Sequence, residues 1–380
     1  MDVSAEIINI LKKVVELHVI IEITENSKSQ NIIDVKDLPK NEVFVSPEKL
    51  LCTTSYHKLK PYLEGTASTN FLVYKTDGFF SSIKKSRLIY SYINKIKPDI
   101  LHIEALLIRS WCLLPSFHKF KKVVLSIHDP IAHFGEKDMK LLRLLKSIIL
   151  NHNKLKGLIF YSDFAKKQFE NYDKHNHQSK WVLKMRPYSY FKNFDQKINL
   201  ETKPHLLFFG RISPYKGIEV LINAIRIVFK TFPHEQLVIA GESVKNYNVP
   251  NEILNEFPNN LTVVNRYLTN IELVKLISNA KFVICPYIEA TQSGVLMTSF
   301  ALNKPVIASN VGAFNEYIEE DKNGFLVPPG DDKILAQKII DLLTDCKYKQ
   351  MFQATTADPL INEWGMNEQL LLKAYSVDNS

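Results

Sequence analysis

Two positively charged residues lie five positions apart on a glycine-flanked segment whose chemistry suits a phosphorylated ligand. The apolar run Leu206–Phe209 is followed by Gly210 and Arg211, then by Lys216 and Gly217, after which a helical pattern begins. Open α/β sheets bind ligands on loops of this kind, and the free backbone N–H groups there favour anions. Arginine offers a planar fork of donors and lysine a mobile point charge, a pair that fits a diphosphate. Two solvated bases on a surface loop would give the same pattern.

The stretch from Phe282 to Gly330 contains a second pattern of this type. The apolar run FVICPY is followed by IEATQSGVL, in which Ser293 and Gly294 stand at the start of a helix expected over residues 295–302. The first amides of a helix have no partner within the helix, so this turn can cap an anion. Glu289 lies on the loop ahead of the helix, where a carboxylate can accept hydrogen bonds from a polyhydroxylated ligand.

Together, the segments GRISPYKG and KPVIASNVGAFNEYIEEDKNGFLVPPGD resemble the C-terminal domain of family 4 glycosyltransferases, which have the GT-B fold. The resemblance is specific over residues 204–345 and extends to the first half at the level of fold. It implies two Rossmann-like domains with parallel sheets facing across a cleft. It also implies a nucleotide-sugar donor held mainly by the second domain, a saccharide acceptor against the first, and no metal, because basic side chains and helix dipoles stabilise the charge.

Carried over by position, the resemblance assigns the donor contacts to two groups of residues. Arg211 and Lys216 would bind the diphosphate, and the amides near Ser293, Gly294 and Val295 would hold its distal phosphate. The full set of expected donor-binding residues is Gly210, Arg211, Lys216, Thr291, Gln292, Ser293, Gly294, Val295 and Thr298.

The sequence departs from the family where two glutamates separated by seven residues are usual. Counting back from Pro305 places Thr298 and Ala290 at these two positions, with Glu289 one residue away. The second glutamate normally holds the ribose of the nucleotide, so Thr298 or Ser299 would have to make that contact here. The chain resembles a subgroup in which an ATQSG segment replaces the glutamate pattern, and the identity of the nucleotide stays open.

His128 and Asp129 directly follow the apolar run KVVLSI, at the carboxyl end of an expected strand. In the family that the chain resembles, a histidine at this strand end lies near the reacting sugar, so the candidate catalytic residues are His128, Asp129 and Glu289. A neutral imidazole can donate to a sugar hydroxyl. A loop histidine satisfied by backbone groups is the alternative. His133 and Glu136 are further candidates for acceptor contact.

The elements that must position these residues alternate between short apolar strands and amphipathic helices, which predicts an α/β fold with parallel sheets. Residues 1–190 are expected to form the acceptor-binding domain, residues 200–345 the nucleotide-sugar-binding domain, and residues 346–380 a helix packing back toward the first. Residues 188–204 lose the periodicity and are interpreted as a linker. Because the chain opens on a helical pattern, we expect that the first strand is missing or that the first domain is shortened.

The formal net charge of +8 is concentrated in the first half of the chain. Residues 1–200 hold 32 Lys and Arg against 20 Asp and Glu (+12), whereas residues 201–380 hold 16 against 20 (−4). The segment 137–156, KDMKLLRLLKSIILNHNKLK, predicts a basic amphipathic helix suited to an anionic membrane surface. A core-packed helix with a solvated face is the alternative. The basic excess comes without a nucleic-acid-binding module, so no nucleic-acid partner is expected.

The remaining composition fits a cytoplasmic protein without a metal or other cofactor. The four cysteines form no CxxC pair, and the eleven histidines lack paired-ligand spacing. The apolar runs are too short to cross a bilayer, so any contact with the inner face of the cell membrane is expected to be peripheral.

We therefore expect a glycosyltransferase that moves a sugar from a nucleotide-diphosphate donor to a carbohydrate or lipid-linked saccharide acceptor in surface polysaccharide biosynthesis. Retention of anomeric configuration is expected from the resemblance. A nucleotide-sugar epimerase or hydrolase of the same fold and a degenerate, non-catalytic nucleotide-sugar-binding partner are the alternatives. Arg211→Ala and Lys216→Ala are each expected to abolish stabilisation by nucleotides while leaving the melting point of the free protein nearly unchanged.

Overall fold

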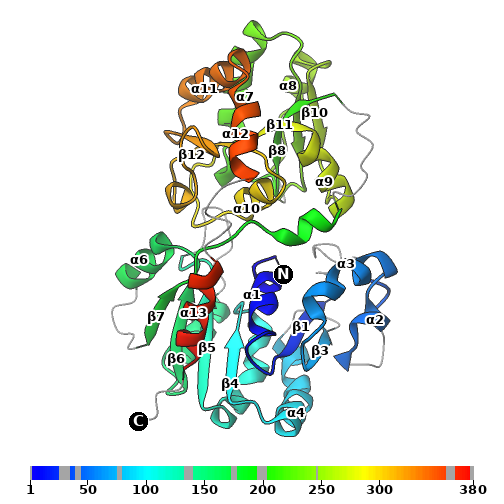
Figure 1. The fold of residues 1–380 in the computed structure, drawn as a ribbon, viewed down its shortest axis with the longest axis vertical. Coiled ribbons are helices and arrows are strands. Elements are labelled where there is room, and N and C mark those ends of the chain that lie inside the picture. Colours follow the sequence, from blue (N-terminus) through cyan, green and yellow to red (C-terminus); the bar gives the residue numbers. More distant parts are fainter. Residues whose placement is uncertain are drawn as a thin grey trace. The chain divides into compact units, whose positions relative to one another are not determined.

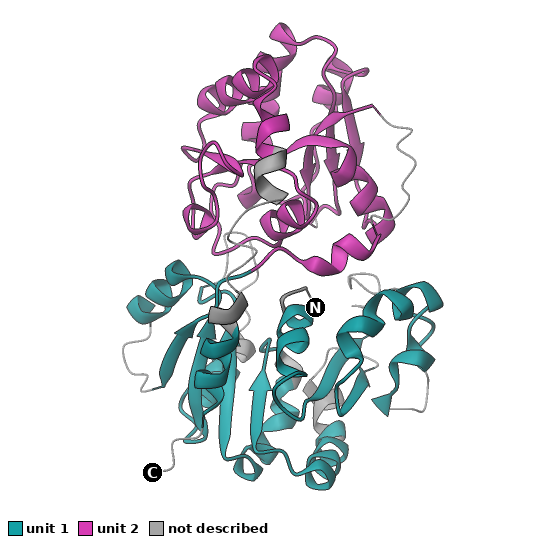
Figure 2. Ribbon diagram, in the orientation of Figure 1, with its two compact units in different colours: residues 1–132, 137–185, 363–380 teal, residues 133–136, 186–362 magenta. Residues whose placement is uncertain are grey.

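The computed structural model describes residues 2–24, 35–38, 44–74, 79–131, 140–172, 178–194, 203–244, 247–356 and 364–376. The chain forms two compact α/β units (Figures 1 and 2). The first comprises residues 1–132, 137–185 and 363–380, and the second comprises residues 133–136 and 186–362. Among the described helices, none has the length and apolar content that crossing a bilayer requires.

The first unit contains two sheets. In the smaller one, β1 pairs in parallel with β3, which also pairs antiparallel with β2; in the larger one, four parallel strands follow one another in the order β4-β5-β6-β7. The strands are β1 (His18–Thr24), β2 (Phe44–Val45), β3 (Ser68–Tyr74), β4 (Ile100–Ile103), β5 (Lys122–Ile127), β6 (Leu155–Phe160) and β7 (Ser179–Val182). The helices are α1 (Asp2–Leu11), α2 (Pro47–Leu50), α3 (Thr53–Leu63), α4 (Phe79–Ile96), η2 (Ile108–Lys119), α5 (Lys140–Leu150), α6 (Asp163–Tyr172) and α13 (Trp364–Tyr375).

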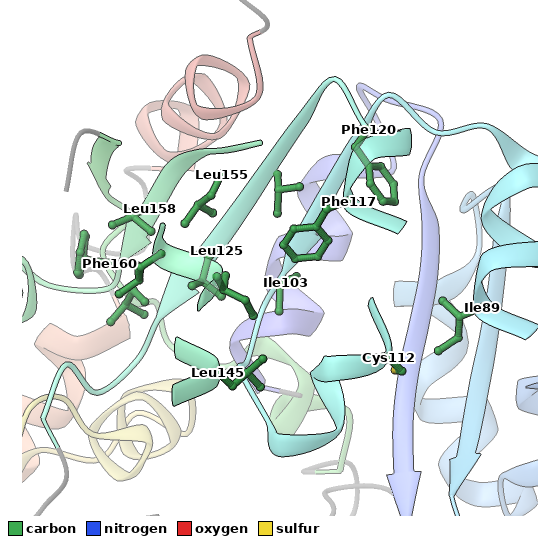
Figure 3. Packing of buried hydrophobic residues seen from close by; sticks show 14 of the residues in the cluster. Ile89, Ile103, Cys112, Phe117, Phe120, Leu125, Leu145, Leu155, Leu158 and Phe160 are labelled. Carbon is green, nitrogen blue, oxygen red and sulfur yellow. The ribbon is translucent and has the colours of Figure 1, made fainter. Parts of the chain in front are cut away.

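One hydrophobic core joins the two sheets of this unit (Figure 3). Every residue of β5 is buried, as expected for a central parallel strand covered on both faces. Tyr74 at the end of β3 belongs to the same buried cluster as Ile103 of β4 and Leu125 of β5, and Phe117 of η2 packs into it. This core fixes the carboxyl ends of β4 and β5 and therefore the polar residues that follow them.

Helix α13 is distant in sequence from the rest of the first unit but packs against β5, β6 and β7. Its Leu371, Ala374 and Tyr375 side chains are buried. The Lys122 ammonium at the start of β5 donates to Ser376 O at 2.7 Å, just after the helix. Residues 364–376 therefore complete a unit that begins at the other end of the chain.

The second unit contains a six-stranded parallel sheet in the order β10-β9-β8-β11-β12-β13. The chain runs outward from β8 to β10, then returns to the other side of β8 and continues outward to β13. This reversal creates a topological switch point between β8 and β11, the position at which open α/β sheets bind ligands. The strands are β8 (His205–Phe209), β9 (Leu237–Ala240), β10 (Leu261–Val264), β11 (Ala280–Cys285), β12 (Val306–Ser309) and β13 (Gly324–Val327). The helices are η3 (Ser189–Phe194), η4 (Pro214–Lys216), α7 (Ile218–Thr231), α8 (Asn251–Glu256), α9 (Asn270–Asn279), α10 (Gly294–Ala301), η5 (Phe314–Glu316), α11 (Asp332–Thr344) and α12 (Lys347–Thr356).

The predicted α/β fold with parallel sheets is confirmed, and the structure adds detail where the sequence pattern was weak. Residues 189–194, interpreted as part of a linker, form η3, and its Tyr190, Phe191 and Phe194 side chains are buried. Buried aromatic residues without a helical or strand period gave no recognisable signal. One helix was expected over residues 346–380, but the structure has two there: α12 belongs to the second unit and α13 to the first.

Candidate active site

Glycine at two positions lets the loop after β8 touch the loop and helix that follow β11. Gly217 has φ +69° and Gly210 has φ +113°, backbone conformations that other residues rarely adopt. A Cβ added to Gly217 would lie 1.8 Å from Pro286 O, and one added to Gly210 would lie 3.1 Å from Val295 Cγ2. The two loops that border the switch point are therefore in direct contact.

Lys216 places a buried cation at this contact. Its Nζ lies 3.7 Å from the ring centroid of Tyr287 and 5.0 Å from that of Tyr215, and the residue is only 9% exposed. The Tyr215 carbonyl accepts a hydrogen bond from the Ile288 N–H at 2.8 Å, which ties the Lys216 turn to the loop after β11. Burial raises the pKa of the Cys285 thiol to about 12, against the opposing influence of the Lys216 charge. A desolvated ammonium attracts an anion more strongly than a hydrated one does.

Arg211 lies between two backbone hydrogen bonds that fix the end of β8. The Gly210 N–H donates to Ala240 O at 2.9 Å, and the Ile212 N–H donates to Glu242 O at 3.0 Å. The Arg211 side chain is exposed, unlike that of Lys216. The two cations of the predicted pair thus differ, because the Arg211 residue is exposed and Lys216 is buried.

The first turn of α10 supplies the second anion-binding feature. Ser293 is the N-cap residue and is buried, but its side chain makes no capping hydrogen bond to the amides of the turn. Tyr188 covers this turn, with its hydroxyl 3.4 Å from the position that a Cβ of Gly294 would take. The Tyr188 N–H also donates to Met297 O at 3.3 Å. The helix therefore begins with amides that its own N-cap side chain does not satisfy, next to a tyrosine that the sequence pattern did not single out.

The loop after β12 completes the neighbourhood of α10. Thr291 O accepts from the Ala313 N–H at 3.1 Å, and a Cβ on Gly312 would lie 2.0 Å from a backbone oxygen of the loop after β11. Thr291 is buried, whereas Glu289 and Gln292 are half-buried. Loops after three neighbouring strands, β8, β11 and β12, are thus packed backbone to backbone.

The two hydroxyls expected near a ribose are already bonded within α10. Thr298 Oγ1 donates to Gly294 O at 2.8 Å, and Ser299 Oγ donates to Val295 O at 2.8 Å. Both residues are buried. Each hydroxyl proton is thereby engaged, so contact with a nucleotide at either position would use the oxygen as an acceptor.

In the first unit, His128 follows β5 and is held by Glu104, which follows β4. Its Nε2 lies 2.9 Å from Glu104 O and 3.1 Å from Glu104 Oε1. Its ring is 4.8 Å from that of Tyr161, centroid to centroid. Burial lowers the pKa of His128, but the hydrogen bond and charge of Glu104, aided by Asp129, outweigh it, so the pKa is raised above its ordinary value. The neighbouring Asp129 is exposed.

Glu104 is a site residue that the sequence reading missed. It comes directly after the apolar run of β4, as His128 does after β5, and these two strands pair in parallel with Ile103 opposite Leu125. Polar residues that follow neighbouring parallel strands meet at the same sheet edge, and this was the available signal. His133 and Glu136, the other candidates in this region, lie outside the described residues.

The predicted basic helix corresponds to α5, which packs on the core and presents a mixed outer face. Leu145 and Ile149 are buried in the cluster of the first unit. The Lys146 ammonium turns inward to donate to Pro130 O at 2.9 Å. Leu144 is 53% exposed and Ile148 37% exposed. The helix therefore packs one side against the core, as the alternative interpretation expected, and exposes a partly apolar outer side.

Comparison with known proteins assigns this architecture to an enzyme class. Residues 191–357 match the family described as glycosyl transferases group 1. A phosphatidyl-myo-inositol mannosyltransferase of Mycobacterium leprae is 27% identical over 176 residues, covering 45% of this chain and 46% of that protein. A capsular polysaccharide biosynthesis glycosyltransferase of Staphylococcus aureus is 25% identical over 244 residues, covering 60% of this chain and 57% of that protein. The matches thus span less than two thirds of these relatives.

Among solved structures, sucrose-phosphate synthase from Thermosynechococcus elongatus superposes with a TM-score of 0.64 at 17% identity, covering 89% of this chain and 86% of that one. Two Rossmann-like units with parallel sheets, matched over nearly the whole chain, define the GT-B fold. The part of the chain from residue 191 to residue 357 is similar to the group 1 glycosyltransferases. The resemblance to family 4 glycosyltransferases drawn from the sequence is confirmed.

Proposed function

We propose that this glycosyltransferase moves a sugar from a nucleoside-diphosphate donor to a hydroxyl of a saccharide or lipid-linked saccharide acceptor. The observation that carries the proposal is the buried Lys216 ammonium at the switch point of the second unit. It lies on the loop that contacts the residues leading into α10. A cation and a helix N-terminus at adjacent loops form a setting suited to a pyrophosphate.

The chemistry follows from the charge that develops on the departing group. When the bond between the sugar and the nucleoside diphosphate breaks, negative charge grows on the diphosphate oxygen. Lys216, Arg211 and the first amides of α10 would stabilise that charge without a metal, and only stabilisation greater in the transition state accelerates the reaction. We extend the proposal to retention of anomeric configuration, with Glu289 and His128 orienting the sugar, as the family resemblance implies.

For the acceptor, we propose a carbohydrate in surface polysaccharide biosynthesis, in line with the capsular relative. We also propose that residues 137–156 contact an anionic membrane surface in the cytoplasm. The Leu144 and Ile148 side chains, one helical turn apart, are exposed, and so is that of Arg143. The charge excess of the first half favours the same contact.

Vesicle sedimentation tests the membrane contact directly. The protein should sediment with vesicles of phosphatidylglycerol and phosphatidylcholine and not with phosphatidylcholine alone. Arg143→Glu should weaken sedimentation, and Lys230→Glu, the same charge change at an exposed residue of α7, should not. Equal sedimentation of the two variants would remove the assignment to α5.

Product analysis with and without acceptor tests the activity. A panel of UDP- and GDP-sugars is first screened by thermal shift, because a ligand that binds only the folded state raises its stability. Stabilising donors are then incubated with saccharide acceptors. A glycosylated product that requires acceptor supports the proposal. Free sugar or an epimer formed at full rate without acceptor would instead identify a hydrolase or epimerase, and nucleotide binding without turnover would identify a non-catalytic binder.

A further inference from the structure

A partly buried network of polar side chains lies around His128 in the first unit. It joins residues that follow three parallel strands, Glu104 after β4, Ser126 and His128 on and after β5, and Tyr161 after β6. It extends through His102 of β4 to Tyr375 of α13 (a residue 273 positions away).

The direction of each hydrogen bond in this network is determined by the atoms available. The Tyr161 hydroxyl donates to Glu104 Oε1, and Ser126 Oγ donates to Glu104 Oε2 at 2.9 Å. With the Ser126 proton engaged there, its oxygen accepts from His102 Nε2 at 2.9 Å. His102 Nδ1 then accepts from the Tyr375 hydroxyl at 2.6 Å. Every donor therefore points, directly or through a neighbour, toward the carboxyl group of Glu104.

A carboxyl group that only accepts hydrogen bonds is ionised. Burial raises the pKa of Glu104, but the hydrogen bonds and charges of His128 and His102, with the Tyr161 hydroxyl, outweigh it and hold the pKa below its ordinary value. Burial lowers the pKa of His102, in keeping with the neutral imidazole that its two hydrogen bonds require. A carboxylate that is largely withdrawn from solvent favours a counter-charge, and of the two histidines in the network His128 is the one that can supply it.

The same contacts fix the tautomer of His128. Both partners of its Nε2 are oxygens of Glu104 without a proton, so Nε2 carries the hydrogen. The second proton can therefore enter only at Nδ1. A neutral His128 would present an acceptor at Nδ1, and only the imidazolium presents a donor there.

We propose that Glu104 is a positioning residue that fixes the Nε2–H of His128 and holds the ring as an imidazolium to interact with the donor sugar. The assignment rests on the proposed transferase function for the identity of the ligand, but the coupling of the two side chains does not depend on it. Among the residues that the structure describes, the charged and titratable groups around His128 include Glu104, Asp129, Tyr161 and His102, and Glu104 bonds to its Nε2 through both a backbone and a side-chain oxygen.

The test compares Glu104→Gln with a matched control, Glu235→Gln. The first substitution removes the charge while keeping an oxygen acceptor, and the second removes a buried carboxylate that pairs with Lys281 in the other unit. Histidine ring resonances of the full chain, with that of His128 assigned by its loss in His128→Gln, give the pKa without any substrate. We expect the His128 pKa to fall in Glu104→Gln and to stay unchanged in Glu235→Gln.

The pH dependence of turnover is the second measurement, with the donor and acceptor identified above. Activity should decline as pH rises through the His128 pKa, and Glu104→Gln should move that decline to lower pH with little change in KM for the donor. At a pH between the His128 pKa values measured for the natural protein and for Glu104→Gln, the kcat of the variant should be lower by at least about tenfold, as expected for loss of a positioned proton donor, and the deficit should shrink at pH values below both.

Each outcome decides the proposal or the function separately. A folded Glu104→Gln protein with an unchanged His128 pKa overturns the proposal, as does a lowered pKa with an unmoved pH profile. If Glu104→Gln does not fold, Glu104→Asp takes its place, because it keeps the charge on a shorter side chain. The His128 pKa of Glu104→Asp should differ less from the natural value than the His128 pKa of the double variant Ser126→Ala, Tyr161→Phe does. The reverse order would refute the network. Absence of turnover with every donor contradicts the transferase function, while the resonance titration still decides the role of Glu104.

Discussion

Replacing Lys216 by methionine isolates its charge from its packing. Methionine keeps most of the length and volume of the side chain on the ring of Tyr287, whereas alanine would remove three buried methylene groups, at about 0.8 kcal/mol each. The sequence alone led us to expect that Lys216→Ala would leave the melting point of the free protein nearly unchanged. The burial of Lys216 revises that expectation, because the alanine variant would lose folding free energy of about 2 kcal/mol through packing alone.

The expected effect on binding follows from a charged hydrogen bond in a desolvated site. Such a bond contributes about 1.5–3 kcal/mol, so its loss should weaken nucleoside diphosphate binding by roughly 10- to 150-fold. A nucleotide at a hundred times its Kd stabilises the folded state by about 2.7 kcal/mol, and after a hundredfold loss of affinity only about 0.4 kcal/mol remains. At about 2–4 °C per kcal/mol for a unit of the size of the second one, roughly 5–9 °C of the thermal shift should disappear.

The assay is a thermal shift titration with UDP and GDP, using Lys338→Met as the control. Lys338 on α11 also lies over an aromatic ring, with Nζ 4.4 Å from the Phe325 centroid. The control should keep the full nucleotide-dependent shift. If Lys216→Met keeps it as well, although UDP or GDP stabilises the natural protein, the buried cation does not bind the diphosphate and the reasoning about the switch point fails.

Two further predictions concern the scaffold. Gly217→Ala should destabilise the second unit by more than about 2 kcal/mol in urea unfolding, because its Cβ would meet Pro286 O at 1.8 Å. The control is Gly330→Ala, at φ +77° with open space around it, which should cost only about 1 kcal/mol. Equal losses of stability in the two variants would contradict the role of the close approach. The Arg266 side chain and the Thr269 N-cap lower the pKa of Glu272 to about 2, so this carboxylate contributes stability that is present above its unfolded pKa and is lost as pH falls toward 2. Glu272→Gln should therefore flatten the acid side of the stability profile, and a profile that matches the natural protein between pH 5 and 2 would show that the capping box carries no charge-dependent stability.

The candidate donor site could be read from the sequence because its residues are close in the chain and punctuated by glycine. Gly210, Lys216 and Gly294 each stand where a short apolar run gives way to a helix, and the structure brings their loops into contact through parallel strand order. The sequence could not show that Lys216 is buried whereas Arg211 is exposed. Lys216 is buried because Tyr287, from a distant loop, covers it, and no local pattern predicts that contact.

The partners of His128 were harder to predict because they come from separate strands and a distant helix. Glu104 is 24 positions from His128, and Tyr375 is 273 from His102. Their meeting depends on the pairing of β4 with β5 and on the docking of α13, which are tertiary facts. Tyr188 was overlooked for a related reason: its segment has buried aromatic residues but neither the helical nor the strand period.

The docking of α13 also has a consequence for synthesis. The residues of the second unit leave the ribosome as one uninterrupted stretch, apart from 133–136, whereas the sheet of the first unit waits for a helix translated after all of them. Until then, His102 lacks the Tyr375 hydroxyl and β6 lacks the cover of Ala374. The second unit can therefore fold before the first is finished, and the histidine network of the first unit forms fully only after α13 has been translated.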